Sequence, residues 1–140
     1  MRRRTLIALL AAGASPAALR AQSAKKAIVG FVSWWPPEMA SHLEALRGGM
    51  RDLGYAEGRD IEFDGHFTSG NRERTQELVQ WLVRRNVDVL VVSTTPVAHI
   101  AKKATSRIPI VMAPVADPLA TGLIASISRP GGNVTGLTSF

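Results

Sequence analysis

The residues best suited to chemistry form a hydroxyl-rich bend, Ser93-Thr94-Thr95, between an apolar run and Pro96. Proline suits the first turn of a helix, so these hydroxyls are expected at a helix N-terminus, where free backbone N–H groups favour a carboxylate or another anion. The sequence therefore predicts that Ser93, Thr94 and Thr95 contact an anionic ligand. A simpler interpretation stays open, in which Thr95 caps the helix and its neighbours satisfy local backbone groups.

Two further bends carry side chains of a suitable kind. Asp117 ends a later apolar run and could pair with a ligand ammonium group, or it could equally cap a helix that begins near Pro118. Ser33 and Trp34 follow the first apolar run of the chain. Trp34 and Trp35 could form an aromatic lip that stacks on a ligand, or they could cover the core, and for Trp35 the core is favoured.

Buried strands must position these bends. Residues 87–92 form a nearly continuous β-branched run, as in a strand covered on both faces, and residues 108–115 form a second apolar run. The segment between them carries apolar side chains at helical spacing. Two buried strands joined by one short helix run parallel with a right-handed crossover, so their C-terminal bends open on the same edge of the sheet. Open α/β folds bind ligands at that edge.

The same alternation of strands and helices continues along the chain. Further strands are expected at residues 27–32, 60–67 and 134–140, and the alternating polarity of the second places it at or near a sheet edge. Further helices are expected at residues 39–53, 71–85 and 121–128. The predicted fold class is α/β, an open parallel five-stranded sheet of order 2-1-3-4-5 with helices on both faces. That order sets the Ser33-Trp34 bend beside the bend at 93–95.

The motifs give little support to enzyme chemistry. The chain has no cysteine, no GxxxxGK[ST] phosphate loop, no dinucleotide-binding glycine fingerprint and no GxSxG elbow. A phosphorelay receiver would need acidic residues where Ser33 and Ser93 stand. The histidines, His42, His66 and His99, show no metal-ligand spacing, and only His99 is expected near the crevice between the bends. The sequence thus predicts no enzyme activity, no cofactor and no metal.

The positive charge is concentrated at the start of the chain. Four of the 17 basic residues lie within residues 1–21, which contain no acid, and the other 13 face 11 acidic residues, a net charge of +2. A basic start followed by a short apolar stretch is typical of an export signal, because a membrane span needs ~20 apolar residues. We expect a signal peptide at 1–21, cleaved after Ala21 or alternatively Ala24, and a linker at 22–26. Arg3-Arg4 also fits twin-arginine export, with general export as the alternative, and no nucleic-acid surface is predicted.

The chain resembles the ABC-transporter substrate-binding protein family of the periplasmic type I fold, in stretches such as LRGGMRDLGYAEGRDIEF, VDVLVVSTTP and DPLATGLIASISRPGGNVTG. The resemblance is to the subfamily that takes up aromatic amino acids, and it covers essentially all of the chain after the leader. It implies two α/β lobes that close around a small ligand at a hinge. It also implies ligand contacts from strand-end bends, here Ser33, the 93–95 bend, Asp117 and Thr138-Ser139. The loop Trp34-Trp35-Pro36-Pro37 departs from the family pattern and leaves the ligand open.

The resemblance also implies a biological role. The complete protein is expected to be periplasmic, to capture a small organic solute such as an amino acid or related carboxylate, and to deliver it to an ABC permease in the inner membrane. Because family members are considerably longer, residues 27–140 are expected to be the N-terminal lobe alone, without the second lobe. Two other interpretations remain open, a small α/β enzyme of the racemase or isomerase type and a sensor ectodomain of the same fold.

Overall fold

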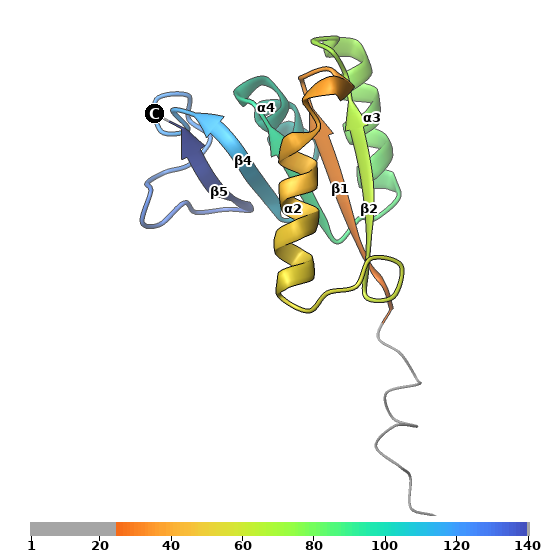
Figure 1. Ribbon diagram of the computed structural model, residues 1–140. Coiled ribbons are helices and arrows are strands. Elements are labelled where there is room, and N and C mark those ends of the chain that lie inside the picture. Colours follow the sequence, from red (N-terminus) through yellow and green to blue (C-terminus); the bar gives the residue numbers. More distant parts are fainter. Residues whose placement is uncertain (1–24, 140) are drawn as a thin grey trace, which may run out of the picture.

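The computed structural model describes residues 25–139 of the chain (Figure 1). The signal peptide expected at 1–21 and most of the expected linker lie outside the described residues. The described elements are, in chain order, β1 (Ala27–Ser33), the 3₁₀ turn η1 (Pro37–Met39), α2 (Ser41–Asp52), β2 (Ile61–Phe67), α3 (Arg72–Arg84), β3 (Val89–Ser93), α4 (Thr95–Ala104), β4 (Ile110–Ala116) and β5 (Val134–Ser139).

The five strands form one parallel sheet of order β2-β1-β3-β4-β5. This is the predicted order, and it confirms that the bends after the strands share one edge of the sheet. The register aligns Ser33 of β1 with Ser93 of β3 and with Phe67 of β2, while Ala116 of β4 aligns with Ser139 of β5. Strand β2 lies at the edge of the sheet, as its alternating polarity predicted.

Helix α2 covers one face of the sheet over β1 and β2 (Figure 1). Leu43 shares a buried hydrophobic cluster there with Phe31 and Ile61. A Cβ atom at position 65 would lie only 2.8 Å from Leu43 Cδ2, so Gly65 permits this close approach of the helix to β2. The core on this face is therefore built from side chains of one helix and three strands, since Val91 of β3 belongs to the same cluster.

Helices α3 and α4 cover the opposite face, so helices lie on both faces as predicted. Val79 and Leu82 of α3 and Val97 of α4 are fully buried there. Asn71 caps α3, because its side-chain oxygen accepts a hydrogen bond from the Arg74 N–H at 2.9 Å. Among residues 25–139, no helix combines the length and the apolar character needed to cross a bilayer.

The segment at 121–128, predicted as a helix, is a series of turns, so that prediction is wrong. The amides of Leu123 and Ile124 both donate to the Pro118 carbonyl, at 2.9 and 3.2 Å, which closes one turn without starting another. Gly122 has a φ of +72°, a left-handed conformation that ends any helical continuation. Leu123 and Ile124 are nevertheless buried, so the turns contribute to the core without forming a helix.

Candidate functional site

The carboxyl ends of β1 and β3 meet at the point where the strand order reverses. Ser33 and Ser93 lie side by side there, 2 % and 1 % exposed, with their Oγ atoms 3.4 Å apart. The Ser33 hydroxyl also accepts a hydrogen bond from the Trp35 N–H at 3.2 Å. The predicted proximity of the two bends is confirmed, and the two serines form part of the framework that holds them.

Thr94 and Thr95 shape the start of α4. Thr94 has φ +81° and ψ 150°, a conformation that is costly for a residue with a Cβ atom. Its buried Oγ1 atom has no hydrogen-bond partner among the described residues, and its N–H donates to the Pro114 carbonyl at 3.2 Å. The Thr95 hydroxyl donates to the Ala116 carbonyl at 3.1 Å, so Thr95 does not cap the helix. The turn from β3 into α4 is instead tied to β4.

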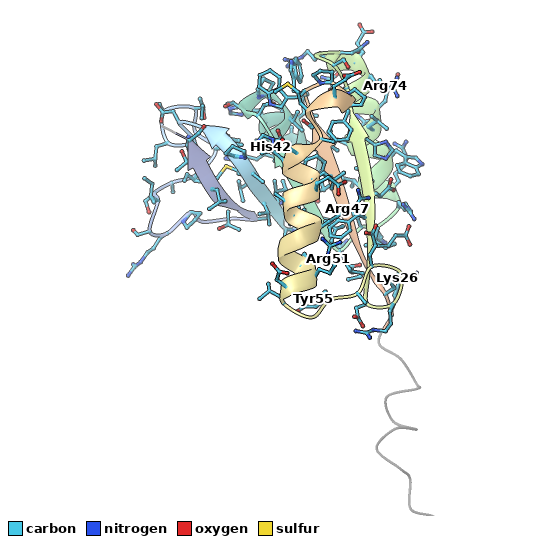
Figure 2. The ribbon with its side chains drawn as sticks, viewed as in Figure 1. Lys26, His42, Arg47, Arg51, Tyr55 and Arg74 are labelled. Atoms are coloured by element: carbon cyan, nitrogen blue, oxygen red, sulfur yellow. The ribbon has the colours of Figure 1, made fainter. Side chains whose placement is uncertain are left out.

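A hollow of about 430 Å³ opens at these bends. Its lining comes from the loop after β1, the first turns of α2 and α4, and the ends of β3, β4 and β5: Trp34, Trp35, His42, Ser93, Thr94, Thr95, Pro96, Pro114, Ala116 and Ser139. Figure 2 shows His42 at the end of α2 nearest the carboxyl ends of the strands. A concave, mostly apolar surface with a few hydroxyl groups is typical of a site for a small organic molecule.

Most of the residues predicted to bind a ligand lie at this hollow. Trp34, Ser93, Thr94 and Thr95 line it, and Ser33 lies behind Ser93. The order of the strands is the reason, because it places the bends after β1 and β3 next to each other.

Asp117 and Thr138 do not belong to the lining. The Asp117 Oδ1 atom accepts a hydrogen bond from the Ala120 N–H at 3.0 Å. The carboxylate therefore closes a turn after β4, where the helix that Asp117 could have capped is not formed. Thr138 pairs with Val115 in the strand register, whereas the next residue, Ser139, reaches the hollow.

Two expectations about ring side chains need correction. His42, and not His99, lines the hollow, because α2 begins right after the loop that follows β1, while His99 lies in a separate groove between α3 and α4. Trp34 packs against the core cluster, whereas Trp35 is 42 % exposed, the reverse of what was favoured for Trp35. The sequence also gave no signal for Pro114, which comes to the rim through the pairing of β3 with β4.

The electrostatics of the hollow favour an anionic group. Among residues 25–139, no carboxylate lines it, and His42 is the sole titratable side chain in its lining. The N-terminus of α4, the positive end of the helix dipole, forms part of the rim. Proton-transfer catalysis needs an acid and a base positioned together, and the lining lacks such a pair. Within residues 25–139, no three His, Cys, Asp or Glu side chains gather as metal ligands.

A family model and a relative of known function both relate this chain to substrate-binding proteins. Residues 25–139 match the family model described as ABC transporter substrate binding protein. A tyrosine-binding protein of Clostridioides difficile (strain R20291) is 35 % identical over 91 residues, which is 65 % of this chain and 26 % of that protein.

Two solved structures are similar over most of the described region. An ABC domain in complex with L-Trp from Streptococcus pneumonia has a TM-score of 0.75 and 26 % identity, covering 81 % of this chain and 39 % of that one. A conserved domain protein from Vibrio cholerae has a TM-score of 0.78 and 35 % identity, covering 83 % of this chain and 40 % of that one. The chain thus spans well under half the length of each of these known proteins.

Proposed function

Because this chain belongs to the ABC transporter substrate-binding protein family, we propose that it captures an amino acid with an aromatic side chain and delivers it to an ABC permease. A relative named for binding tyrosine and a similar structure solved with L-Trp support this class of solute. The proposed role is non-enzymatic and extracytoplasmic, with export through the signal peptide expected at 1–21. The twin-arginine route remains an option for that export step.

The hollow at the carboxyl edge of the sheet is the observation that carries the proposal. Its apolar walls, including the exposed ring of Trp35, suit an aromatic side chain. Its hydroxyls and the N-terminus of α4 suit the carboxylate of an amino acid. Ser93, Thr94 and Thr95 are the proposed carboxylate contacts, and Trp34 and Trp35 line the side-chain end.

We propose that residues 27–140 act as one of two lobes. The similar solved chains are more than twice as long as the part that this chain matches, which supports a second lobe in the complete protein. In that arrangement the hollow is half of the site. Ser139 lines it and Asp117 directly follows Ala116 of the lining, so closure of the second lobe could bring a ligand to both residues. A single lobe buries less of the ligand and therefore binds it more weakly.

The test is a ligand titration of the full chain with a matched pair of tryptophan variants. L-Trp and L-Tyr are compared with L-Ala, which lacks the ring, and with tryptamine, which lacks the carboxylate, by thermal shift and by fluorescence. L-Trp and L-Tyr are expected to raise the melting temperature, because a ligand that binds the native state stabilises it. L-Ala and tryptamine are expected to have much smaller effects.

Trp35→Ala and Trp81→Ala make the test specific, because both indoles are 42 % exposed but only Trp35 lines the hollow. Trp35→Ala is expected to weaken L-Trp binding by about threefold to tenfold, since an aromatic contact is lost. Trp81→Ala is expected to leave the affinity unchanged. Equal affinities in the two variants, or equal responses to L-Trp and L-Ala, would contradict the proposal.

A further inference from the structure

A second, separate concavity lies between α3 and α4, on the face of the sheet opposite α2. It encloses about 260 Å³ and is lined by Arg72, Gln76, Gln80, His99, Ile100, Lys103 and Ala104. None of these residues lines the hollow at the carboxyl edge. This concavity, the α3–α4 groove, is therefore a distinct surface of the lobe.

The spacing of the lining residues explains why they converge. Arg72, Gln76 and Gln80 recur at every fourth position of α3 and thus share one side of that helix. His99 and Lys103 are likewise four residues apart on α4. The two helices run in the same direction over the same face of the sheet, so the two polar rows face each other across a floor that includes Ile100 and Ala104.

The α3–α4 groove carries a net positive charge. Among residues 25–139, its lining contains two permanent cations, two amides and one imidazole, and no carboxylate. None of the ion pairs within residues 25–139 involves Arg72 or Lys103. The adjacent Lys102 is used differently, because its Nζ donates to the carbonyls of Gly122 and Leu123 at 2.8 and 3.1 Å. Lys102 thus holds the turns after β4 in place, whereas the ammonium group of Lys103 is available to bind a ligand.

The pKa of His99 responds to the positive charges around the groove. Burial and the neighbouring charges of Lys102 and Lys103 lower the pKa of His99 below its ordinary value. The direction agrees with the geometry, since a positive surrounding disfavours a further positive charge. An anion placed in the groove would reverse that effect.

We propose that the α3–α4 groove binds a compact anion bearing phosphoryl oxygens. Arg72 offers a planar fork that can bind two such oxygens, and Lys103 adds a point charge from the opposite helix. The amides of Gln76 and Gln80 supply neutral donors for the remaining oxygens. Free phosphate and a phospholipid headgroup present the same chemistry, so the experiment has one arm for each.

The first arm titrates inorganic phosphate into the full chain at constant ionic strength and follows backbone amides by NMR. Arg72→Gln/Lys103→Gln removes both groove cations. Arg74→Gln/Arg84→Gln is the matched control, because it removes the same charge from α3 outside the groove. The groove variant is expected to bind phosphate about fivefold to tenfold more weakly than the control variant, which keeps the wild-type affinity. Circular dichroism verifies that both variants are folded.

A second readout uses sulfate, whose charge is constant near neutral pH. Arg72 faces His99 from α3, and Lys102 and Lys103 neighbour it on α4, with no acid in the groove lining. Bound sulfate is expected to raise the pKa of His99, because protonation of His99 and anion binding favour each other reciprocally.

The second arm measures co-sedimentation with vesicles of phosphatidylglycerol and, as a control, phosphatidylcholine. If the wild-type chain sediments with phosphatidylglycerol vesicles and the groove variant does not, the proposal is supported and the ligand is a lipid headgroup. Phosphate binding without sedimentation also supports it and identifies a free anion. Equal phosphate affinities of the groove and control variants, or no saturable binding of either probe, overturn the proposal. The amino-acid titration is independent, because the groove variant retains the whole carboxyl-edge hollow.

Discussion

Two halves of the sheet are stabilised in different ways. The helix-covered half consists of β1, β2 and α2, and the turn-linked half consists of β4, the turns at 117–133 and β5 (Figure 1). Phe31, Leu43 and Ile61 in the first half are 1 %, 5 % and 3 % exposed. In β5, Val134 is buried at 3 % exposure, whereas Leu137 is 70 % exposed. Burial of large side chains therefore stabilises the helix-covered half far more than β5.

Within the turn-linked half, backbone fit and hydrogen bonds hold β5, whereas β4 and the turns still bury side chains such as Ile110, Met112 and Leu123. Asn133 Nδ2 donates to two carbonyls of the α4–β4 connection, and Lys102 Nζ donates to two carbonyls of the turns, at distances between 2.8 and 3.1 Å. At Gly136 the backbones of β5 and β4 approach so closely that no side chain fits. The comparison teaches that the helix-covered half should be sensitive to lost volume, and β5 to altered backbone or lost hydrogen bonds.

The largest expected effect is that of Phe31→Ala in the helix-covered half. The free energy of unfolding should fall by about 3–5 kcal/mol, because a fully buried ring is replaced by a cavity. Leu137→Ala in the turn-linked half should change it by less than about 0.5 kcal/mol, since that side chain is exposed. Urea denaturation of both variants measures the difference. Comparable losses of unfolding free energy in the two variants would contradict the difference between the two halves.

Gly136→Ala should give the next largest effect. A Cβ atom there would lie 2.4 Å from the backbone N and O atoms of Met112, and the φ of +132° is unfavourable for alanine. We expect a loss of about 2–3 kcal/mol, with reduced hydrogen-exchange protection in β4 and β5 but not in β2.

Gly132→Ala is the control for that substitution. Gly132 also has a positive φ, +62°, but a Cβ atom there meets nothing within 4 Å. This substitution should lower the free energy of unfolding by about 1 kcal/mol, because alanine disfavours a positive φ and no steric clash adds to that cost. If the two alanine variants lose the same stability, close strand approach at Gly136 is not what holds β5.

Asn133→Ala should have the smallest of the three effects. It removes hydrogen bonds to the Thr105 and Ile108 carbonyls, at 3.1 and 2.8 Å, and should cost about 1–2 kcal/mol. Hydrogen exchange should quicken around β4 and β5 and stay unchanged in β1. Faster exchange spread evenly over the sheet would show that the two halves do not open separately.

The same contrast explains what the sequence could predict of the fold. Buried β-branched runs and helical spacing are local signals, and together with the rules for parallel crossovers they were sufficient for the strand order. The helix predicted at 121–128 was wrong, because the apolar residues of this segment are buried by turns rather than by a helix. Those turns depend on Gly122 and on hydrogen bonds to Pro118, which no periodicity reveals.

The candidate site was predictable to a similar degree. Ser33 and the 93–95 bend followed from strand order alone. The left-handed backbone of Thr94 and the hydrogen bond from Thr95 to β4 could not be predicted, because they depend on how a neighbouring strand meets the bend. His42 was missed because it reaches the hollow through the direction of α2 after the loop, and that direction is a tertiary property.

The 3₁₀ turn at Pro37–Met39 buries none of its residues, although it follows directly after the two indoles at the mouth of the hollow. Substitutions there remove no core contact, so they should be nearly neutral for folding while changing what the mouth presents to solvent. Natural variation can therefore accumulate in this segment faster than in the strands beneath it. Descendants of one ancestral gene would then differ at the mouth of the hollow while inheriting the same scaffold.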